Sequence, residues 1–317
     1  MTSINSFLNS YEKISSREYE NGDPKLLKEN GLDLTSSSAI YPDENSEKIA
    51  EAAGNPIRAL TEEEIHDLIY NKFTEAAKNA LAAGFDYIEI HGANGYLIDQ
   101  FLQPGTNTRT DNYGGSIENR ARFALELIDR LINVVGANKL AIRISPFSKF
   151  QGMKAEDDTV HPITTFGYLL HELQKRADRG DKLAYISVVE ARLPGNEDAV
   201  DSLISVDTTF VNQIWRGVIL KAGNYTYDAP DFQNVLRDIS DDRTLIGFAR
   251  HYTSNPDLVK RLYEGWELTP YDRDTFYTKN NWRYNTWTNY YEKDNFNKKE
   301  EINRVAQAIE GIEVVQT

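Results

Sequence analysis

Cysteine is absent from the 317 residues of this chain. Disulfide bonds, thiolate catalysis and cysteine-ligated metal sites are therefore excluded. No segment approaches the ~18 consecutive apolar residues that a membrane-spanning helix requires, so we expect no membrane span. The first twenty residues lack the apolar stretch of a secretory signal and are too acidic for a transit peptide, so we expect a cytoplasmic protein.

Basic residues are outnumbered by acidic ones. The chain has 35 Lys and Arg against 49 Asp and Glu, which gives a formal net charge of −14. Nucleic acid and anionic membrane surfaces would be repelled at long range, so neither is an expected partner. Metal-ligand patterns are missing too, because the sequence contains no HExxH motif and no carboxylate-rich calcium loop. We therefore expect no metal.

Strand-like and helix-like segments alternate from Leu60 onward, which is typical of a parallel sheet covered by helices. A long amphipathic helix is predicted from Thr61 to about Ala83, with Thr61 as N-cap and Glu64 in the capping-box position. Two further predicted helices are Asn119–Val135 and Pro162–Ala177. The five predicted strands are Tyr87–His91, Leu140–Ser145, Leu183–Glu190, Val218–Asn224 and Thr244–Arg250.

Polar side chains gather behind the first predicted strand. His91, Asn94 and Tyr96 lie at its carboxyl end, and Gly92 and Gly95 between them permit tight turns. In parallel α/β proteins ligands bind at that edge of the sheet. Such a cluster could hold a carbonyl oxygen and deliver a proton nearby. Alternatively, His91 is a strand-end histidine with satisfied hydrogen bonds, and Tyr96 is a packing residue with a tethered hydroxyl.

A polar, turn-rich segment of ~15 residues separates this cluster from Ser116, which could cap the next helix. It contains Asn107, Arg109, Asp111 and Tyr113. Connections of that length within a compact domain are usually functional.

Two of these stretches, HGANGY at 91–96 and NTRTDNYGGSIENRARF at 107–123, closely resemble the old yellow enzyme family of flavin-dependent ene-reductases. The resemblance covers roughly residues 20–280. It continues through the segments RISP at 143–146, AGN at 222–224, GFAR at 247–250, SNPD at 254–257 and YDRDTFY at 271–277.

The resemblance implies an α/β fold, the TIM (β/α)8-barrel of the FMN-linked oxidoreductase type, with strands 4 to 8 recognisable. Only 60 residues precede the helix at Thr61, and three βα units do not fit there, so we expect the first three strands to be missing. The expected domains are an unassigned segment at 1–20, a partial barrel at 21–280 and an aromatic, helical extension at 281–317. The extension ends in a predicted amphipathic helix that starts at Lys298.

The resemblance also implies a reaction, with FMN as cofactor and NADPH as hydride donor. Small enals and enones would be the substrates, and phenols would bind over the flavin. His91 and Asn94 match the pair that binds the substrate carbonyl oxygen, and Tyr96 matches the residue that donates a proton to the α-carbon. Phe276 and Tyr277 match the aromatic lining of the substrate site, although apolar core packing is the alternative for both.

Arg143 lies on a predicted strand whose residues Leu140, Ile142 and Ile144 are apolar, so its guanidinium is costly to bury without an acceptor. The resemblance places this arginine against the flavin, and a salt bridge to a neighbouring carboxylate is the alternative.

The flavin phosphate site is expected at Gly223, Asn224, Ala249 and Arg250, although Arg250 could instead be surface charge. Ala249 stands where the family usually has glycine, so its methyl group is expected to crowd the phosphate. A homo-oligomer is compatible with the sequence. The alternative function is a truncated, non-catalytic family member with weak or no flavin binding that acts as a ligand-binding or interaction protein.

Overall fold

The computed structural model describes residues 2–3, 23–191, 208–276, 278 and 280–304. They form two compact units, the first from Met1–Tyr225 with Gln233–Gly247 and the second from Thr226–Phe232 with Phe248–Thr317. Most of the unassigned segment 1–20 lies outside the described residues. The domain division expected from the sequence stays a prediction.

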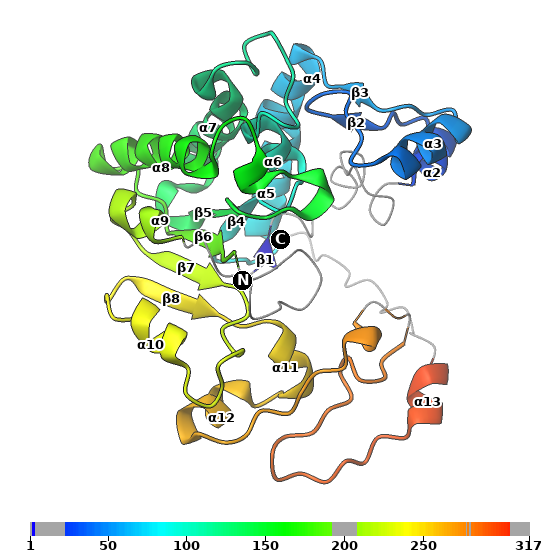
Figure 1. Cartoon of the computed structure of the whole chain (residues 1–317), viewed down its shortest axis with the longest axis vertical. Coiled ribbons are helices and arrows are strands. Elements are labelled where there is room, and N and C mark those ends of the chain that lie inside the picture. The colour runs from blue at the N-terminus through cyan, green and yellow to red at the C-terminus, as the bar shows by residue number, and fades with distance from the viewer. Residues whose placement is uncertain (1, 4–22, 192–207, 277, 279, 305–317) are drawn as a thin grey trace, which may run out of the picture. The chain divides into compact units, whose positions relative to one another are not determined.

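A parallel sheet of six strands in the order β1-β4-β5-β6-β7-β8 forms the centre of the first unit (Figure 1). The strands are β1 (Thr2–Ser3), β4 (Ile88–Gly92), β5 (Leu140–Ile144), β6 (Tyr185–Val189), β7 (Ile219–Ala222) and β8 (Thr244–Gly247). All five strands predicted from the sequence are confirmed. The last strand was predicted to extend to Arg250, but β8 ends at Gly247, whose pairing partner is Ala222. The residue directly after β7, Gly223, has a φ of 146° and leaves the extended conformation.

The register of β4, β5 and β6 gives this part of the sheet one apolar and one polar face. Cross-strand partners point the same way, and successive residues alternate between the faces. The apolar face holds Ile88, Ile90, Ile142, Ile144, Ile186 and Val188, all at most 1% exposed. The polar face holds Glu89, His91, Arg143, Tyr185 and Ser187.

Helices α5 (Phe73–Ala82), α7 (Ile117–Val135) and α8 (Pro162–Asp178) pack side by side against the strands (Figure 1). Their buried residues join the apolar face of the sheet in one hydrophobic core. The predicted helices of this layer are confirmed, with Ser116 as the N-cap of α7 through its bond to the Asn119 amide. The core therefore lies on the side of the sheet away from the polar face.

The predicted helix from Thr61 is present but interrupted. It consists of α4 (Glu62–Asp67), one π-helical turn η1 (Leu68–Lys72) and α5. The capping box is confirmed, since the Glu64 amide donates to Thr61 Oγ1 at 3.1 Å and the Thr61 amide donates to Glu64 Oε2 at 2.8 Å. The π turn, closed by the Phe73 amide on the Leu68 carbonyl, was not predicted, because apolar periodicity does not register one extra residue in a turn.

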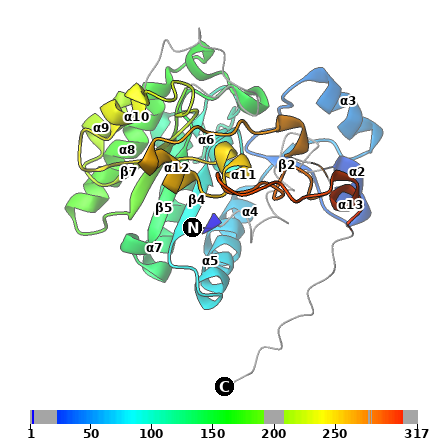
Figure 2. The ribbon, with the colours of Figure 1, turned by 90° about the horizontal axis from the view of Figure 1, so that it is seen from below.

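Residues 23–60 form a small layer at the side of the first unit (Figure 2). It contains α2 (Pro24–Glu29), β2 (Thr35–Ser36), α3 (Glu44–Ala52) and β3 (Arg58–Ala59), with β2 and β3 paired in parallel. Leu27, Leu34, Ala50 and Ile57 form its own hydrophobic cluster. The layer is thus a separate packing element beside the sheet.

The remaining elements of the first unit are α6 (Leu97–Leu102), η2 (Ala137–Lys139), η3 (Phe150–Gly152), η4 (Ala155–Asp157), α9 (Thr209–Ile214) and α10 (Gln233–Asp238). The second unit holds α11 (Arg250–Ser254), α12 (Leu258–Glu264), η5 (Arg273–Thr275) and α13 (Lys298–Asn303). The predicted terminal helix begins at Lys298 as expected, and its continuation past residue 304 lies outside the described residues. None of the described helices is long and apolar enough to cross a membrane.

Candidate active site

A tight turn follows β4 at the carboxyl edge of the sheet. The Tyr96 amide donates to the Ala93 carbonyl at 3.2 Å, and Asn94 and Gly95 both have positive φ, 56° and 72°. Two successive left-handed residues are characteristic of a type I′ turn. Glycine is required at 95, because a Cβ there would lie 2.8 Å from Gln151 Cβ. The turn therefore packs directly against η3 and leaves no room for a side chain at position 95.

This turn carries the predicted substrate-binding and proton-donating residues. The ring centroids of His91 and Tyr96 lie 5.1 Å apart at 61°, an edge-to-face contact, and Asn94 is half-buried in the same turn. Burial, together with the nearby positive charge of Arg143, lowers the pKa of His91 to about 3. His91 is therefore a neutral imidazole at pH 7, able to donate one N–H.

Two buried residues that the sequence analysis missed hold the backbone of the turn. The Gly95 amide donates to Asp99 Oδ2 at 2.9 Å, and the Asn94 amide donates to Ser145 Oγ at 2.6 Å. The signal for Asp99 was available in the sequence, since it is the one acidic residue in the otherwise apolar and amide run LIDQFL at 97–102. Ser145 offered none beyond its place at the end of a strand.

Arg143 lies beside His91 in the strand register, on the polar face of the sheet. Its Nε is buried and has no hydrogen-bond partner among the residues that the structure describes. The carboxylate of Glu89, whose pKa burial raises, interacts electrostatically with Arg143 and hydrogen-bonds Tyr185 and Ser187. The carboxylate foreseen in the salt-bridge alternative is therefore present as Glu89, yet one donor of Arg143 remains open.

The unpartnered Nε of Arg143 indicates whether a flavin fits the polar face of the sheet. A buried, unpaired N–H carries a desolvation penalty of ~1–3 kcal/mol until an acceptor reaches it. The pyrimidine edge of a flavin presents such acceptors, and its reduced form gathers negative charge that a guanidinium stabilises. The donor set of the polar face therefore fits the group.

The four residues expected at the flavin phosphate divide between the two units. Gly223 and Asn224 follow β7 in the first unit, and Ala249 and Arg250 begin α11 in the second. Packing alone explains the glycine at position 223, because a Cβ there would lie 2.8 Å from Glu190 Cβ. Their role at a phosphate stays a prediction.

The predicted aromatic lining belongs to the second unit. Phe276 lies 5.4 Å from Tyr271, centroid to centroid, with the Arg273 guanidinium 5.4 Å above its ring. Phe276 thus packs within its own unit, and its role over a flavin stays a prediction. Tyr277 lies outside the described residues.

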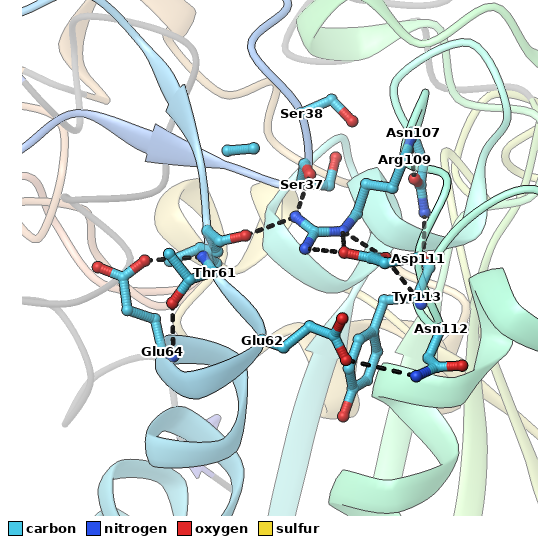
Figure 3. Close-up of polar contacts among 12 residues, drawn as sticks. Ser37, Ser38, Thr61, Glu62, Glu64, Asn107, Arg109, Asp111, Asn112 and Tyr113 are labelled. Carbon is cyan, nitrogen blue, oxygen red and sulfur yellow. Dashed lines mark hydrogen bonds and ion pairs between the residues drawn. The ribbon is translucent and has the colours of Figure 1, made fainter.

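The long loop before α7 has a structural explanation (Figure 3). Arg109 Nε pairs with the Asp111 carboxylate at 3.0 and 3.1 Å, and its Nη1 donates to the carbonyls of Ser37 and Leu60 at 2.9 and 2.6 Å. Asn107 Nδ2 donates to two further carbonyls at 2.7 Å. The loop that suggested a functional segment therefore fastens residues 37 and 60 to the body of the unit.

Gln151 is a second residue near the turn that no sequence pattern indicated. Its side chain is 3% exposed, and neither amide atom has a hydrogen-bond partner among the described residues. Its backbone is left-handed, with a φ of 56°. Its Cβ faces Gly95, so this unpaired amide lies next to the candidate site.

The chain is similar over most of its length to known proteins. The model of the NADH:flavin oxidoreductase / NADH oxidase family matches residues 18–269. The probable NADPH dehydrogenase of Candida albicans is 53% identical over 265 residues, which is 83% of this chain and 64% of that protein. Enoate reductase 1 of Kluyveromyces lactis is 42% identical over 254 residues, 79% of this chain and 63% of that protein.

The crystal structure of Old Yellow Enzyme from Pichia sp. AKU4542 superposes with a TM-score of 0.80 at 48% identity, covering 88% of this chain and 68% of that one. This likeness confirms the predicted α/β fold of the TIM-barrel type, of which the five predicted strands are present as β4 to β8 in one parallel sheet. The chain spans about 64% of the length of the curated relatives it matches.

Proposed function

The chain belongs to the NADH:flavin oxidoreductase / NADH oxidase family, and from this premise we propose that it is an FMN-dependent ene-reductase using NADPH. Its substrates would be small α,β-unsaturated aldehydes and ketones, and phenols would bind as non-reacting ligands. The observation that carries the proposal is the His91–Tyr96 ring contact at the carboxyl edge of a strand whose neighbour presents the open donor of Arg143. FMN, when bound, supplies the two-electron carrier between nicotinamide and alkene.

The substrate carbonyl oxygen would accept hydrogen bonds from His91 and Asn94. As a hydride reaches the β-carbon, negative charge grows on that oxygen, and two fixed donors stabilise the resulting enolate. A pKa near 3 keeps His91 neutral, so it donates its N–H without giving up a proton to the oxygen. The hydrogen-bonded turn around Asn94 and Gly95 supports this role, because preorganised donors need no rearrangement during the reaction.

Tyr96 would complete the reaction by protonating the α-carbon. A phenol with an ordinary pKa of ~10 is protonated at pH 7 and can transfer its proton to a strongly basic enolate carbon. Hydride at the β-carbon and proton at the α-carbon together give the saturated carbonyl compound, and solvent returns a proton to the phenolate. The contact with His91 fixes the phenol beside the carbonyl-binding donor.

Arg143 would hold the pyrimidine edge of the flavin, which its buried Nε supports. Gly223, Asn224, Ala249 and Arg250 would bind the phosphate, and Phe276 with Tyr277 would line the substrate site. These assignments follow the family resemblance. The name of the Kluyveromyces lactis relative, enoate reductase, supports alkenes next to a carbonyl group as the substrate class.

The deciding experiment measures flavin content and turnover of the purified full chain. Absorbance between about 350 and 500 nm reports bound flavin, and NADPH oxidation with 2-cyclohexen-1-one reports alkene reduction. We expect flavin absorbance and enone-dependent NADPH oxidation. A colourless protein that stays colourless after incubation with FMN contradicts the proposal and favours the non-catalytic binding protein.

A further inference from the structure

We propose that Asp99, acting together with Ser145, is a positioning residue that sets the geometry of the turn carrying Asn94 and Tyr96. The inference deepens the proposed function and rests on it for the roles of those two side chains. The hydrogen bonds of Asp99 and Ser145 to the turn end on its backbone amides and not on the side chains of Asn94 and Tyr96.

The two central amides of the turn both end on this pair. The Gly95 amide donates to Asp99 Oδ2 at 2.9 Å, and the Asn94 amide donates to Ser145 Oγ at 2.6 Å. The Ser145 hydroxyl in turn donates to Asp99 Oδ2 at 3.5 Å. Each left-handed residue of the turn thus has its own acceptor, and the two acceptors are linked.

The carboxylate is itself held in one orientation. Gln103, the residue directly after α6, donates from Nε2 to Asp99 Oδ1 at 2.8 Å, which leaves Oδ2 facing the turn. Gln100 donates to the Gly95 carbonyl at 2.8 Å. Both the amide N–H and the carbonyl of Gly95 are therefore bound by side chains of α6.

Ser145 connects this arrangement to the strand expected to hold the flavin. It stands two residues after Arg143, at the carboxyl end of β5. The position of the turn is thus set relative to Arg143 through a hydrogen bond between the segments that directly follow β4 and β5, and not through helix α6 alone. A change at Ser145 would move the donor of the carbonyl contact with respect to the open guanidinium.

The burial of the Asp99 carboxylate costs free energy and calls for an explanation. Asp99 is fully buried, in a helix whose six residues are all buried, where an apolar side chain would avoid the desolvation of an acid. Leucine has the same branching as aspartate but would leave the Gly95 amide without an acceptor. What distinguishes aspartate from leucine at this position is therefore the hydrogen bond to the turn.

The test uses the full chain with four substitutions. Asp99→Leu removes the acceptor, Asp99→Asn keeps an oxygen in the same place, and Ser145→Ala removes the second acceptor. Leu102→Ala is the matched control, because Leu102 is fully buried on the same helix and its side chain makes no hydrogen bond. Amide hydrogen exchange of Asn94 and Gly95 is followed by NMR without flavin, and para-chlorophenol binding is measured after loading with FMN.

We expect Asp99→Leu to accelerate exchange of the Gly95 amide and to weaken phenol binding, each by ~10-fold or more. Asp99→Asn should stay within about threefold of the wild type in both, since its oxygen still accepts. Ser145→Ala should accelerate exchange at Asn94 more than at Gly95. Leu102→Ala should lower the melting temperature without singling out either amide.

Unchanged Gly95 exchange in Asp99→Leu overturns the proposal, as does an Asp99→Asn variant as impaired as Asp99→Leu. If Asp99→Leu does not fold, the Ser145→Ala result decides, and unchanged exchange at Asn94 overturns the proposal. The expected exchange pattern in a protein that binds neither FMN nor phenol supports the positioning role and contradicts the proposed function, so the two failures are distinguishable.

Discussion

His91 and Tyr96 meet edge to face, with their ring centroids 5.1 Å apart. The histidine is the last residue but one of a strand and the tyrosine precedes a helix, so the four residues between them reverse the direction of the chain. The reversal depends on the two left-handed residues Asn94 and Gly95. The residues that we propose for substrate recognition and proton delivery therefore lie next to one another at one turn.

Replacing Tyr96 by phenylalanine should separate the two half-reactions. Flavin reduction by NADPH should remain nearly intact, whereas enone reduction should slow by ~10²-fold or more, because only the second half-reaction needs the acid. Stopped-flow absorbance measures each half. Tyr87→Phe, at an exposed tyrosine, is the control and should change neither rate. Equal slowing of both half-reactions by Tyr96→Phe would remove Tyr96 from the role of proton donor.

Asp99 should make stability depend on pH. Burial raises its pKa from 3.8 to about 6, opposed by hydrogen bonds from Gln103, Gly95 and Ser145. The folded state therefore prefers the protonated acid, and this contribution, present below pH ~4, is lost as pH rises through about 6. Relative to Asp99→Asn, the wild type should lose at most about 3 kcal/mol of unfolding free energy between pH 4.5 and 7.5.

Urea denaturation of both proteins across that pH range measures the difference. Parallel stability curves for wild type and Asp99→Asn would show that the carboxyl group is not desolvated in the folded protein. A wild type that instead loses unfolding free energy relative to Asp99→Asn as the pH falls would contradict the prediction, because it would mean that the folded protein stabilises the charged form of Asp99.

Arg109 should matter for stability more than its place in a surface loop suggests. Its side chain is only 7% exposed, and lysine cannot reproduce both the paired contact with Asp111 and the bonds to two carbonyls. We expect Arg109→Lys to lower the unfolding free energy by ~2–4 kcal/mol in denaturant titrations. Arg216→Lys, in an exposed pair with Asp178, should change it by less than ~1 kcal/mol. Similar values for the two variants would contradict the structural role of the loop.

Gln151 gives a prediction of opposite sign. Both atoms of its buried amide lack partners among the described residues, so Gln151→Leu should leave the flavin-free protein unchanged or stabilise it by ~1 kcal/mol. Gln103→Leu is the matched control, because it breaks the bond to Asp99 and should destabilise by ~1–2 kcal/mol. Thermal unfolding compares the two. A clear loss of stability in Gln151→Leu would mean that this amide has a partner in solution.

Local sequence determined much of the fold. The capping box of Thr61 and Glu64 spans three residues, and the strands from Ile88 to Gly247 follow from short apolar runs separated by helical periodicity. Such features depend on neighbours along the chain, and the predicted ends of these elements lie within a few residues of the observed ends. The cluster of His91, Asn94 and Tyr96 was visible for the same reason, since all three lie in one turn.

Contacts between distant segments could not be predicted in this way. Ser145 supports Asn94 from 51 residues away, and Arg109 binds the carbonyl of Ser37 across 72 residues. Nothing in either local sequence indicates its partner, because the register of parallel strands and the path of the loops decide which side chains meet. The sequence by itself determined which residues could perform the chemistry, and the tertiary structure decided how they are held, since a buried acceptor such as Ser145 acquires its role only when folding brings it within hydrogen-bonding distance of a distant turn.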